Sequence, residues 1–529
     1  MSELENEINR RRTFAIISHP DAGKTTLTEK LLLYSGMIRT AGMVSGRKGN
    51  KGASSDWMSM EQERGISISS SSMQFEYKGY KINVLDTPGH SDFSEDTYRT
   101  LTAADSVIMV IDSSKGIEAQ TLKLFAACRL RNIPIITFIN KMDLYGREPI
   151  DLMEEVESVL GIQASAMNWP IGYGKEFTGV VDRASNKCLF YKRVASGGSL
   201  KPEVEVVPVD ELEPRPMLSQ AEIDTLRESL ELQDIAGNDF NLEDYRNFKT
   251  TPVFFGSAMS NFGIEPLFDA LVDLAPCPWS RKATLKDGSE VLVETTNEEF
   301  SAFVFKLQAN MNPKHRDCIA FMRINSGKYV KDMTVIHTKT GKKVRLASPH
   351  SLMAAERKTV EAAFPGDVIG INNTVGLSIG DSLSSKGKYE FEALPQFHPE
   401  LFARVTPVDL GKRKAIDKGL TQLANEGTVQ LINEWKDNFS YPFIAAVGQL
   451  QFEVLQHRLN EEYGVETKLE IMPYACSAWL KGDPTSFKIP YSARLVQDKY
   501  ERPMVLFSSE WEKEYAKKEN PDHELLNYS

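Results

Sequence analysis

The sequence predicts an α/β P-loop domain with an insertion, followed by an antiparallel β-barrel domain and a ferredoxin-like α+β domain. Near the N-terminus, a short apolar segment leads through a Gly-Lys-Thr loop into a helix. The middle of the chain has short alternating segments with glycine-bearing turns, which are typical of a small barrel. The third observation is a β-α-β-β-α-β order of segments, which is the split unit of ferredoxin-like folds.

The loop at residues 18–26 (SHPDAGKTT) is predicted to bind phosphate. Residues 13–18 are apolar enough for a buried strand, and residues 25–33 show the spacing of a helix. The turn between them presents backbone N–H groups and a helix N-terminus to a polyphosphate. We expect Lys24 to reach the outer phosphates and the Thr25 hydroxyl to bind Mg²⁺. A Gly-Lys-Thr sequence before a helix also arises by chance, and serine replaces the usual first glycine here. The predicted loop residues are Ser18, His19, Pro20, Asp21, Ala22, Gly23, Lys24, Thr25 and Thr26.

A second segment, DTPGH at residues 86–90, is predicted to sense the γ-phosphate. Residues 75–85 alternate and then become apolar, as expected for one strand that runs into the core. This strand would deliver Asp86, whose carboxylate holds Mg²⁺ through water, and Gly89, whose N–H contacts the γ-phosphate. His90 can orient the attacking water, although a histidine in an exposed loop is the simpler interpretation of that residue alone. The predicted catalytic residues are His90, Lys24 and Gly89, and the segment is completed by Thr87 and Pro88.

Guanine specificity is predicted from NKMD at residues 140–143, which follows an apolar strand at 133–139. The carboxylate of Asp143 can accept hydrogen bonds from the N1–H and N2–H₂ groups of guanine. Adenine lacks this pair of donors, and an unpaired buried carboxylate is costly, so ATP is rejected. We expect Lys141 to lie along the base and Asn140 to brace the loop. The residues whose backbone would read the guanine carbonyl are Ser257 and Ala258. Together these segments predict a GTPase that binds GTP or GDP with Mg²⁺.

The RGISI sequence at residues 64–68 completes a set that resembles the translational GTPases, which share SHPDAGKTT-like loops, an RGITI-like switch and DTPGH. The resemblance implies that Ser67, where most relatives have threonine, binds Mg²⁺ through its hydroxyl in the GTP state. It implies that Pro20 and Ile66 flank His90 as an apolar gate. It also implies that a backbone phosphate of large-subunit rRNA places His90 for hydrolysis.

Composition and charge exclude several classes of protein. No apolar run approaches the ~18–20 residues of a membrane-spanning helix, and the charged N-terminus lacks the apolar core of a signal peptide. The five cysteines show no metal-binding or pairing pattern, which favours a cytoplasmic location. The net charge is −11, yet residues 301–350 hold ten Lys or Arg and two Asp, and residues 201–250 hold thirteen Asp or Glu and five Lys or Arg. This asymmetry suits one face on RNA phosphates and another on a basic protein, or simply two solvated faces.

The limits of the first domain follow from changes of pattern along the chain. We expect a GTP-binding domain at 12–280, with an insertion at about 150–250, because roughly 110 residues separate Asp143 from Ser257. An insertion stands at the same place in elongation factor G. By that resemblance, the acidic insertion would contact the ribosomal stalk protein.

The barrel is expected at 295–390 and the ferredoxin-like domain at 398–529, with residues 517–529 frayed. The expected barrel strands are residues 302–307, 319–324, 334–337, 343–346 and 368–371. The expected elements of the third domain are strands at 404–409, 429–435, 443–447 and 465–471 and helices at 412–425 and 450–463.

The series of domains narrows the resemblance to one family. Elongation factor G carries two further domains after its ferredoxin-like domain, whereas about 55 residues remain here. The arrangement, together with SDWMSMEQERGISI, DFSEDTYRTL and QANMNPKHRDCIAFMRINSGKY, resembles the bacterial class II release factors. The resemblance implies a ribosome-stimulated GTPase of translation termination that promotes dissociation and recycling of the stop-codon-reading release factors after peptide release. Its expected partners are the ribosome, through rRNA and the stalk protein, and those release factors, with no membrane and a monomeric state.

Three alternatives stay open from the residues. A translocase-like or ribosome-protection GTPase is the nearest, and it would carry further C-terminal domains. A GTPase subunit of a metabolic enzyme, as in sulfate-activating complexes, would hydrolyse GTP without any response to ribosomes. A switch that binds nucleotide without turnover would release no phosphate.

Overall fold

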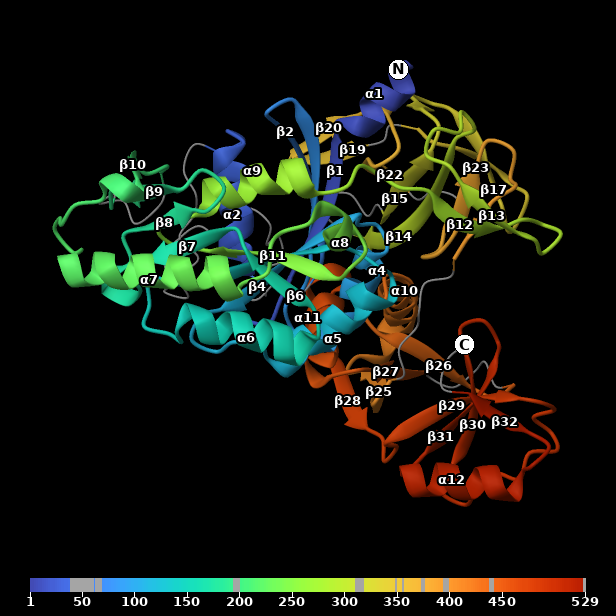
Figure 1. Ribbon diagram of the computed structural model, residues 1–529. Helices are drawn as coiled ribbons and strands as arrows, with labels where there is room; N and C mark the ends of the chain where they lie inside the picture. The colour runs from blue at the N-terminus through green and yellow to red at the C-terminus, as the bar shows by residue number, and fades with distance from the viewer. Residues whose placement is uncertain are drawn as a thin grey trace.

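The first part of the chain is built around a seven-stranded sheet with the order β2-β3-β1-β4-β5-β11-β6 in the computed structural model (Figure 1). Only β2 runs antiparallel to its neighbour, and all other pairs are parallel. The strands are β1 (Arg11–Ser18), β2 (Ser71–Tyr77), β3 (Tyr80–Asp86), β4 (Ser106–Asp112), β5 (Ile135–Asn140), β6 (Gln163–Ala166) and β11 (Thr250–Phe255). The structure describes residues 1–38, 61, 69–193, 200–309, 318–347, 350–353, 356–372, 376–392, 399–436 and 442–526.

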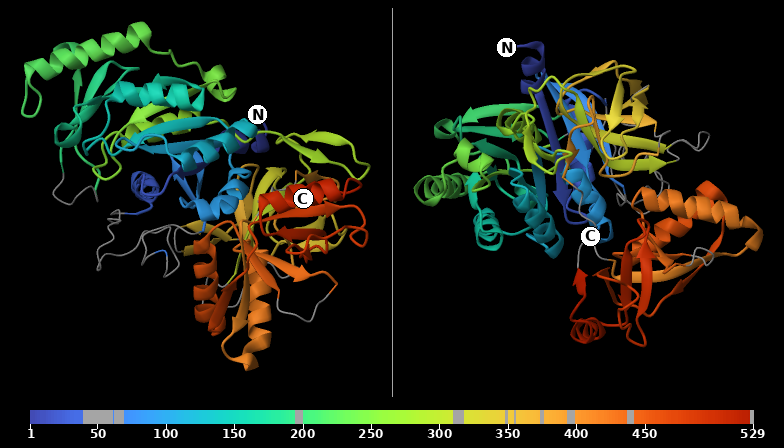
Figure 2. Two further views of the ribbon diagram at one scale, coloured as in Figure 1. Left: turned by 90° about the horizontal axis from the view of Figure 1, so that it is seen from below. Right: turned by 90° about the vertical axis from the view of Figure 1, so that its right-hand side faces the viewer.

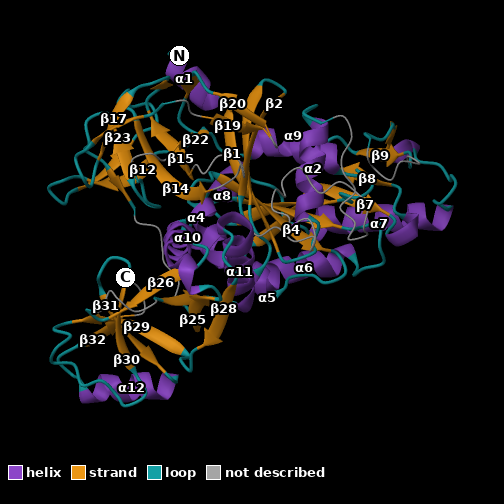
Figure 3. Cartoon of the chain, turned by 180° about the vertical axis from the view of Figure 1, so that it is seen from behind, coloured by secondary structure: helices purple, strands orange, loops and turns teal. Residues whose placement is uncertain are grey.

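Helices cover both faces of this sheet (Figure 3). Side chains of α2 and α9 pack on one face around Phe268, and those of α5 and α6 pack on the other face around Leu124 and Leu152. Strands buried on both faces read as continuous apolar runs, which is why β1 and β5 could be predicted from residues 13–18 and 133–139. The helices of this part are α1 (Glu3–Asn9), α2 (Lys24–Tyr34), α4 (Ser94–Leu101), α5 (Ala119–Leu130), α6 (Pro149–Leu160) and α9 (Ile264–Leu274).

The expectation of one strand over residues 75–85 is wrong. The segment belongs to the β2–β3 hairpin, whose turn lies at Lys78 and Gly79. These two residues have φ values of 47° and 84°, and positive φ at both central positions matches the twist of a two-residue hairpin. The alternation belongs to β2 and the apolar run belongs to β3, so Asp86 still ends a strand in the core.

Between β5 and β11 the chain builds a second layer at the edge of the molecule furthest from the C-terminal end (Figure 2). Its antiparallel sheet has the order β10-β9-β8-β7. The helix α7 packs on this layer through Ile223, Leu226 and Leu230. The elements are β7 (Asn168–Ile171), β8 (Gly179–Asp182), β9 (Lys187–Tyr191), β10 (Val204–Pro208), α7 (Gln220–Ala236) and α8 (Leu242–Arg246).

The middle of the chain forms a curled antiparallel sheet with the order β18-β17-β23-β14-β15-β22-β19-β20, which we call the barrel. Two small sheets, β13-β12-β24 and β16-β21, complete it. The strands are β12 (Arg281–Thr284), β13 (Glu290–Val293), β14 (Ser301–Ala309), β15 (Cys318–Ser326), β16 (Tyr329–Val330), β17 (Thr334–His337), β18 (Lys343–Arg345), β19 (His350–Met353), β20 (Glu356–Thr359), β21 (Ala362–Ala363), β22 (Val368–Asn372), β23 (Ser382–Ser384) and β24 (Glu390–Phe391).

Buried ion pairs join the barrel to the first part. Arg323 of β15 donates to Asp105 at 2.6 Å, and both side chains are almost fully buried. Arg11 of β1 lies 2.9 Å from the buried carboxylate of Asp367. Because separating such pairs would leave uncompensated buried charges, the barrel and the first part are held as one unit.

The C-terminal part begins with the predicted ferredoxin-like unit. Its first strands have the order β28-β25-β27-β26, in which all neighbours are antiparallel. Helices α10 and α11 pack on one face of this sheet through Ile416, Leu420 and Leu459. The elements are β25 (Leu401–Pro407), α10 (Arg413–Asn425), β26 (Gln430–Glu434), β27 (Phe443–Ala446), α11 (Gln449–Tyr463) and β28 (Thr467–Ile471). The predicted fold class is confirmed.

The sheet continues beyond this unit, which was not predicted. Four more antiparallel strands extend it in the order β30-β31-β29-β32, and Trp479 packs against Phe443 on the face opposite the helices. The expectation that residues 517–529 are frayed is wrong for 517–526. A helix capped by Ser509 runs into this segment, and β32 pairs with β29. The added elements are β29 (Cys476–Lys481), β30 (Arg494–Asp498), β31 (Pro503–Phe507), α12 (Glu510–Glu519) and β32 (Glu524–Leu526).

Candidate functional site

The predicted phosphate loop lies between the end of β1 and the start of α2. Gly23 stands at the N-terminus of α2 with φ 98°, a conformation that favours glycine. A Cβ built on Gly23 would overlap the amide nitrogen of Asn140, so the loop also needs glycine for space. Asp21 has φ 66° and turns the backbone before the helix. Successive N–H groups in such a turn, together with the helix N-terminus, form an anion-binding cradle.

Asn140 connects three of the predicted segments. Its side-chain Nδ2 donates to the carbonyl oxygen of Ala22 at 2.8 Å, and its Oδ1 accepts from the N–H of Ala258 at 2.8 Å. The side chain is buried. Because both ends of the amide are used, Asn140 fixes the phosphate loop, NKMD and the loop after β11 relative to one another.

Lys24 and Asp86 meet at the end of the phosphate loop. The Lys24 ammonium donates to Oδ1 of Asp86 at 2.6 Å, and both side chains are buried. The second oxygen, Oδ2, is buried and has no hydrogen-bond partner in the part of the chain that the structure describes. A buried carboxylate oxygen without a donor fits a cation or an ordered water.

This donor set fits Mg²⁺ better than a transition metal. Within the described residues there is no group of three or more His, Cys, Asp or Glu side chains that could hold a metal ion. Mg²⁺ is usually held by one or two carboxylates together with waters and substrate phosphates. The hydroxyl of Thr25, on the first turn of α2, and the second oxygen of Asp86 are the candidate contacts.

The loop predicted to read the base, residues 140–143, is held by a pair that the sequence analysis missed. Lys141 has φ 68°, and its ammonium donates to Oδ2 of Asp112 at 2.7 Å. Burial by itself raises the pKa of Asp112, but hydrogen bonds from Lys141 and Ser114 outweigh it and lower the pKa. Asp112 ends an apolar run at the end of β4, which was the available signal. One oxygen of Asp143 is buried without a hydrogen-bond partner among the described residues, as expected for a carboxylate whose donors would come from a bound ligand.

His90 follows Gly89 directly beside the phosphate loop. A Cβ on Gly89 would contact the Pro20 backbone at 3.6 Å, so the two segments touch. Nδ1 of His90 accepts from the backbone N–H of Asp92 at 3.3 Å, and the side chain is 36% exposed. In the neutral ring this bond leaves the proton on Nε2, where it can be donated to a water. Asp92 was another residue that the sequence analysis missed.

The structure describes several of the remaining predicted site residues but not the RGISI segment. Nε2 of His19 lies 3.6 Å from a carboxylate oxygen of Glu118, and neither nitrogen of this buried histidine has a hydrogen bond in the described chain. Thr87 donates to the carbonyl oxygen of Ile16 and so ties the DTPGH segment to β1. Ser257 pairs with Phe262 in the loop after β11. The RGISI segment, including Ile66 and Ser67, lies outside the described residues.

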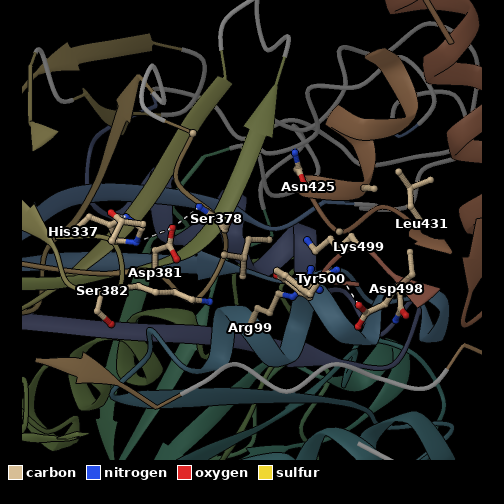
Figure 4. Close-up of a pocket in the computed structure, with 18 of the residues that line it drawn as sticks. Arg99, His337, Ser378, Asp381, Ser382, Asn425, Leu431, Asp498, Lys499 and Tyr500 are labelled. Atoms are coloured by element: carbon tan, nitrogen blue, oxygen red, sulfur yellow. Dashed lines mark hydrogen bonds and ion pairs between the residues drawn. The ribbon is translucent and has the colours of Figure 1, made fainter. Parts of the chain in front are cut away.

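A separate cavity of about 580 Å³ lies where the three parts of the chain meet (Figure 4). Arg99 of α4 borders it from the first part, and His337 and Asp381 border it from the barrel. Lys499 and Tyr500 border it from the C-terminal part. None of the residues that line this cavity was predicted to bind nucleotide.

Comparison with known proteins agrees with this architecture in all three parts. Residues 9–277 match the model described as elongation factor Tu GTP binding domain. Residues 299–386 match elongation factor G domain 2, and residues 391–517 match class II release factor RF3, C-terminal domain. The fold and the site together define a translational GTPase, an enzyme that hydrolyses GTP.

The chain belongs to the peptide chain release factor 3 family. Peptide chain release factor 3 of Cyanothece sp. is 50% identical over 529 residues, covering 99% of this chain and 96% of the relative. The same factor of Listeria monocytogenes is 48% identical over 531 residues, covering 99% of each chain. A crystal structure of a protein from Thermus thermophilus has a TM-score of 0.69 at 20% identity, covers 93% of this chain and 72% of that one, and supports the fold. The protein is therefore a GTPase factor of translation termination.

None of the helices among the described residues is long and apolar enough to cross a membrane.

Proposed function

We propose that this protein is a ribosome-stimulated GTPase that promotes dissociation and recycling of the stop-codon-reading release factors after peptide release. The observation that carries the proposal is the placement of His90. Its ring is held by the backbone N–H of Asp92, and the preceding residue, Gly89, touches the phosphate loop. The match of the C-terminal part to the class II release factors supports the assignment to termination.

Nucleotide binding is assigned to the residues of the phosphate loop and the base-reading loop. The N–H groups of residues 18–26 would hold the phosphates, and Lys24 would share its ammonium between Asp86 and the outer phosphates. Asp143 would accept the two guanine donors, with Lys141 along the base and the backbone of Ser257 and Ala258 on the guanine carbonyl. Mg²⁺, held by Thr25, Ser67 and Asp86 through water, would supply neutralisation of the phosphate charge when bound.

Hydrolysis is assigned to His90. The Nε2–H of the ring would hold the attacking water in line with the γ-phosphorus. As the water oxygen bonds to this phosphorus, the bond to the bridging oxygen would break and a water proton would pass to a phosphate oxygen. Gly89 N–H and Lys24 would stabilise the charge that develops on the phosphoryl oxygens. Pro20 and Ile66 would keep the His90 ring away from the γ-phosphate until rRNA places it there. GDP and phosphate are the products.

Nucleotide state would then bias the arrangement of the parts. The barrel and the first part are joined by buried ion pairs, whereas the C-terminal part contacts them through hydrogen bonds such as that from Ala309 to Glu426, so the C-terminal part would be the one that changes its position. The GTP arrangement would bind one conformation of the ribosome, through rRNA and the stalk protein, better than the other. Hydrolysis would release the protein as a monomer to the cytoplasm. The domain limits 12–280, 295–390 and 398–529 belong to the same proposal.

The test uses ribosomes that have released their peptide and still hold a labelled stop-codon-reading factor. Addition of this protein with GTP should accelerate dissociation of the label. His90→Ala should lose most of the ribosome stimulation, which in GTPases of known mechanism is worth ~10³–10⁵ in rate. His523→Ala, in the C-terminal part, is the control. Unchanged release of the label, or tRNA translocation instead, would overturn the proposal.

A further inference from the structure

The helix α11 begins against a carboxylate that belongs to a different part of the chain. The backbone N–H of Leu450, in its first turn, donates to Oδ2 of Asp92 at 2.8 Å. Asp92 lies in η1 (Ser91–Phe93), the short turn that His90 begins. The residue before the helix is Gly448, which has no side chain to act as a cap. A carboxylate here satisfies a free N–H group at the positive end of the helix dipole, so Asp92 caps α11 across the boundary.

Gly448 makes room for this contact. A Cβ built on Gly448 would overlap the carboxylate of Asp92. The φ value of Gly448 is −146°, which any residue can adopt. The close approach of Asp92, rather than the backbone conformation, is therefore the reason for glycine at this position.

The same aspartate also holds the ring of His90. Its backbone N–H donates to Nδ1 of the neutral ring at 3.3 Å. Its Oδ1 lies 3.2 Å from the same nitrogen and would pair with it only in the protonated ring. The Asp92 side chain is only 13% exposed. One residue therefore links the histidine to which hydrolysis is assigned with the first turn of α11, although Asp92 and Leu450 are 358 positions apart.

The C-terminal part meets this segment again at the other end of α4, which follows η1 directly. Arg99 lies against Gly427, and a Cβ on Gly427 would overlap its guanidinium. Arg99 also lines the cavity of Figure 4, close to Lys499 and Tyr500 of the C-terminal part. The segment from η1 to α4 thus contacts the C-terminal part at both of its ends.

We propose that Asp92 is a positioning residue for GTP hydrolysis, through which the seating of the C-terminal part sets the orientation of the His90 ring. This rests on the proposed role of His90. While α11 is seated, the cap holds η1 and with it the N–H group that fixes Nδ1. When α11 moves away, the carboxylate loses its partner and the ring loses its fixed orientation. Hydrolysis is thereby fastest in the arrangement in which the C-terminal part is docked.

The test compares Asp92→Ala, Asp92→Asn and Gly448→Ala in the full chain with ribosomes. A small misplacement of a reacting group can cost up to ~100-fold in rate, so we expect Asp92→Ala and Gly448→Ala to lower the ribosome-stimulated kcat roughly 10- to 100-fold. The KM for ribosomes and the Kd for GTP should stay unchanged, because no binding group is altered. Asp92→Asn keeps an oxygen for the Leu450 N–H and should lose less. Hydrogen exchange of the Leu450 amide should be faster in Asp92→Ala.

A double-mutant cycle separates this link from general damage. Gly448→Ala acts by displacing the Asp92 carboxylate, so it should have almost no further effect in the Asp92→Ala background. Gly411→Ala is the matched control, since its Cβ would meet only Asp409 of the same part. It should leave kcat unchanged.

The outcomes distinguish this inference from the proposed function. If His90→Ala abolishes stimulation but Asp92→Ala keeps full kcat, the positioning role is wrong and the function stands. If Gly448→Ala costs as much without the Asp92 carboxylate as with it, the link through Asp92 is also wrong. If His90→Ala itself has no effect, the proposed function fails first.

Discussion

The ammonium of Lys24 lies 2.6 Å from the carboxylate of Asp86, and both side chains are buried. The two residues come from different predicted segments, the phosphate loop and DTPGH, and the parallel pairing of β1 with β3 brings the segments together. A buried pair of this kind stays in place because removal of either partner leaves the other charge unpaired. The pair therefore positions the Lys24 side chain through contacts within the protein itself.

Lys24→Met is expected to weaken GTP binding and the fold together. The variant removes the cation from the proposed phosphates and leaves Asp86 unpaired, and hydrogen bonds to charged groups contribute about 1.5–3 kcal/mol each. The affinity for a fluorescent GTP analogue should fall by about 10- to 100-fold. Lys123→Met, on the exposed side of α5, is the control. Unchanged affinity of Lys24→Met for the GTP analogue would show that Lys24 does not bind the nucleotide.

Asp143→Asn is expected to shift the nucleotide preference from GTP toward XTP. The asparagine amide can donate to the second carbonyl of xanthine, whereas the carboxylate accepts from the amino group of guanine. GTP affinity should fall by about 10- to 100-fold while XTP affinity rises. Competition of both nucleotides for the wild type and the variant measures this exchange. A loss of GTP binding with no gain for XTP speaks against Asp143 as the base reader.

Arg323→Met should destabilise the junction of the barrel and the first part. The variant leaves Asp105 without its 2.6 Å partner, although Arg281 remains at 3.6 Å. Removal of one partner from a buried pair costs about 3–5 kcal/mol, and the residual cation places the expected loss near the lower end. Lys192→Met breaks an exposed pair with Glu203 and should leave the stability almost unchanged, because exposed ion pairs contribute little. The midpoint of urea unfolding compares the two, and equal midpoints would contradict the expectation.

Stability should depend on pH through Cys128. Burial raises the pKa of this thiol from 9.0 to about 12. Above pH 9 the unfolded chain loses the proton while the folded chain keeps it, so the free energy of unfolding falls as the pH rises. The change is about 1.4 kcal/mol per pH unit. Urea unfolding at pH 8 and pH 10 should therefore show that wild type loses about 1.4 kcal/mol more than Cys128→Ala. Parallel losses in the two proteins would rule out this thiol as the cause.

Much of the fold was predictable because its signals are local. The strand that ends at Ser18, the helix after Gly23 and the strand that ends at Asn140 all carry apolar patterns of the right length. The hairpin at Lys78 and Gly79 was missed because the pattern of apolar residues does not reveal a positive φ at a lysine. The extra strands after β28 were missed because their burial depends on the face of a sheet already formed.

The sequence by itself determined the class of chemistry, since motif residues such as Lys24, Asp86 and Asp143 need only their spacing and their place at the ends of strands. Tertiary structure alone decided how these pieces are held. Asn140 bridges two loops, Asp112 binds Lys141, and Asp92 joins His90 to the helix that starts at Leu450. These contacts join residues tens to hundreds of positions apart, and hydrogen bonds reach only about 3 Å. Only the folded chain brings such groups within that distance.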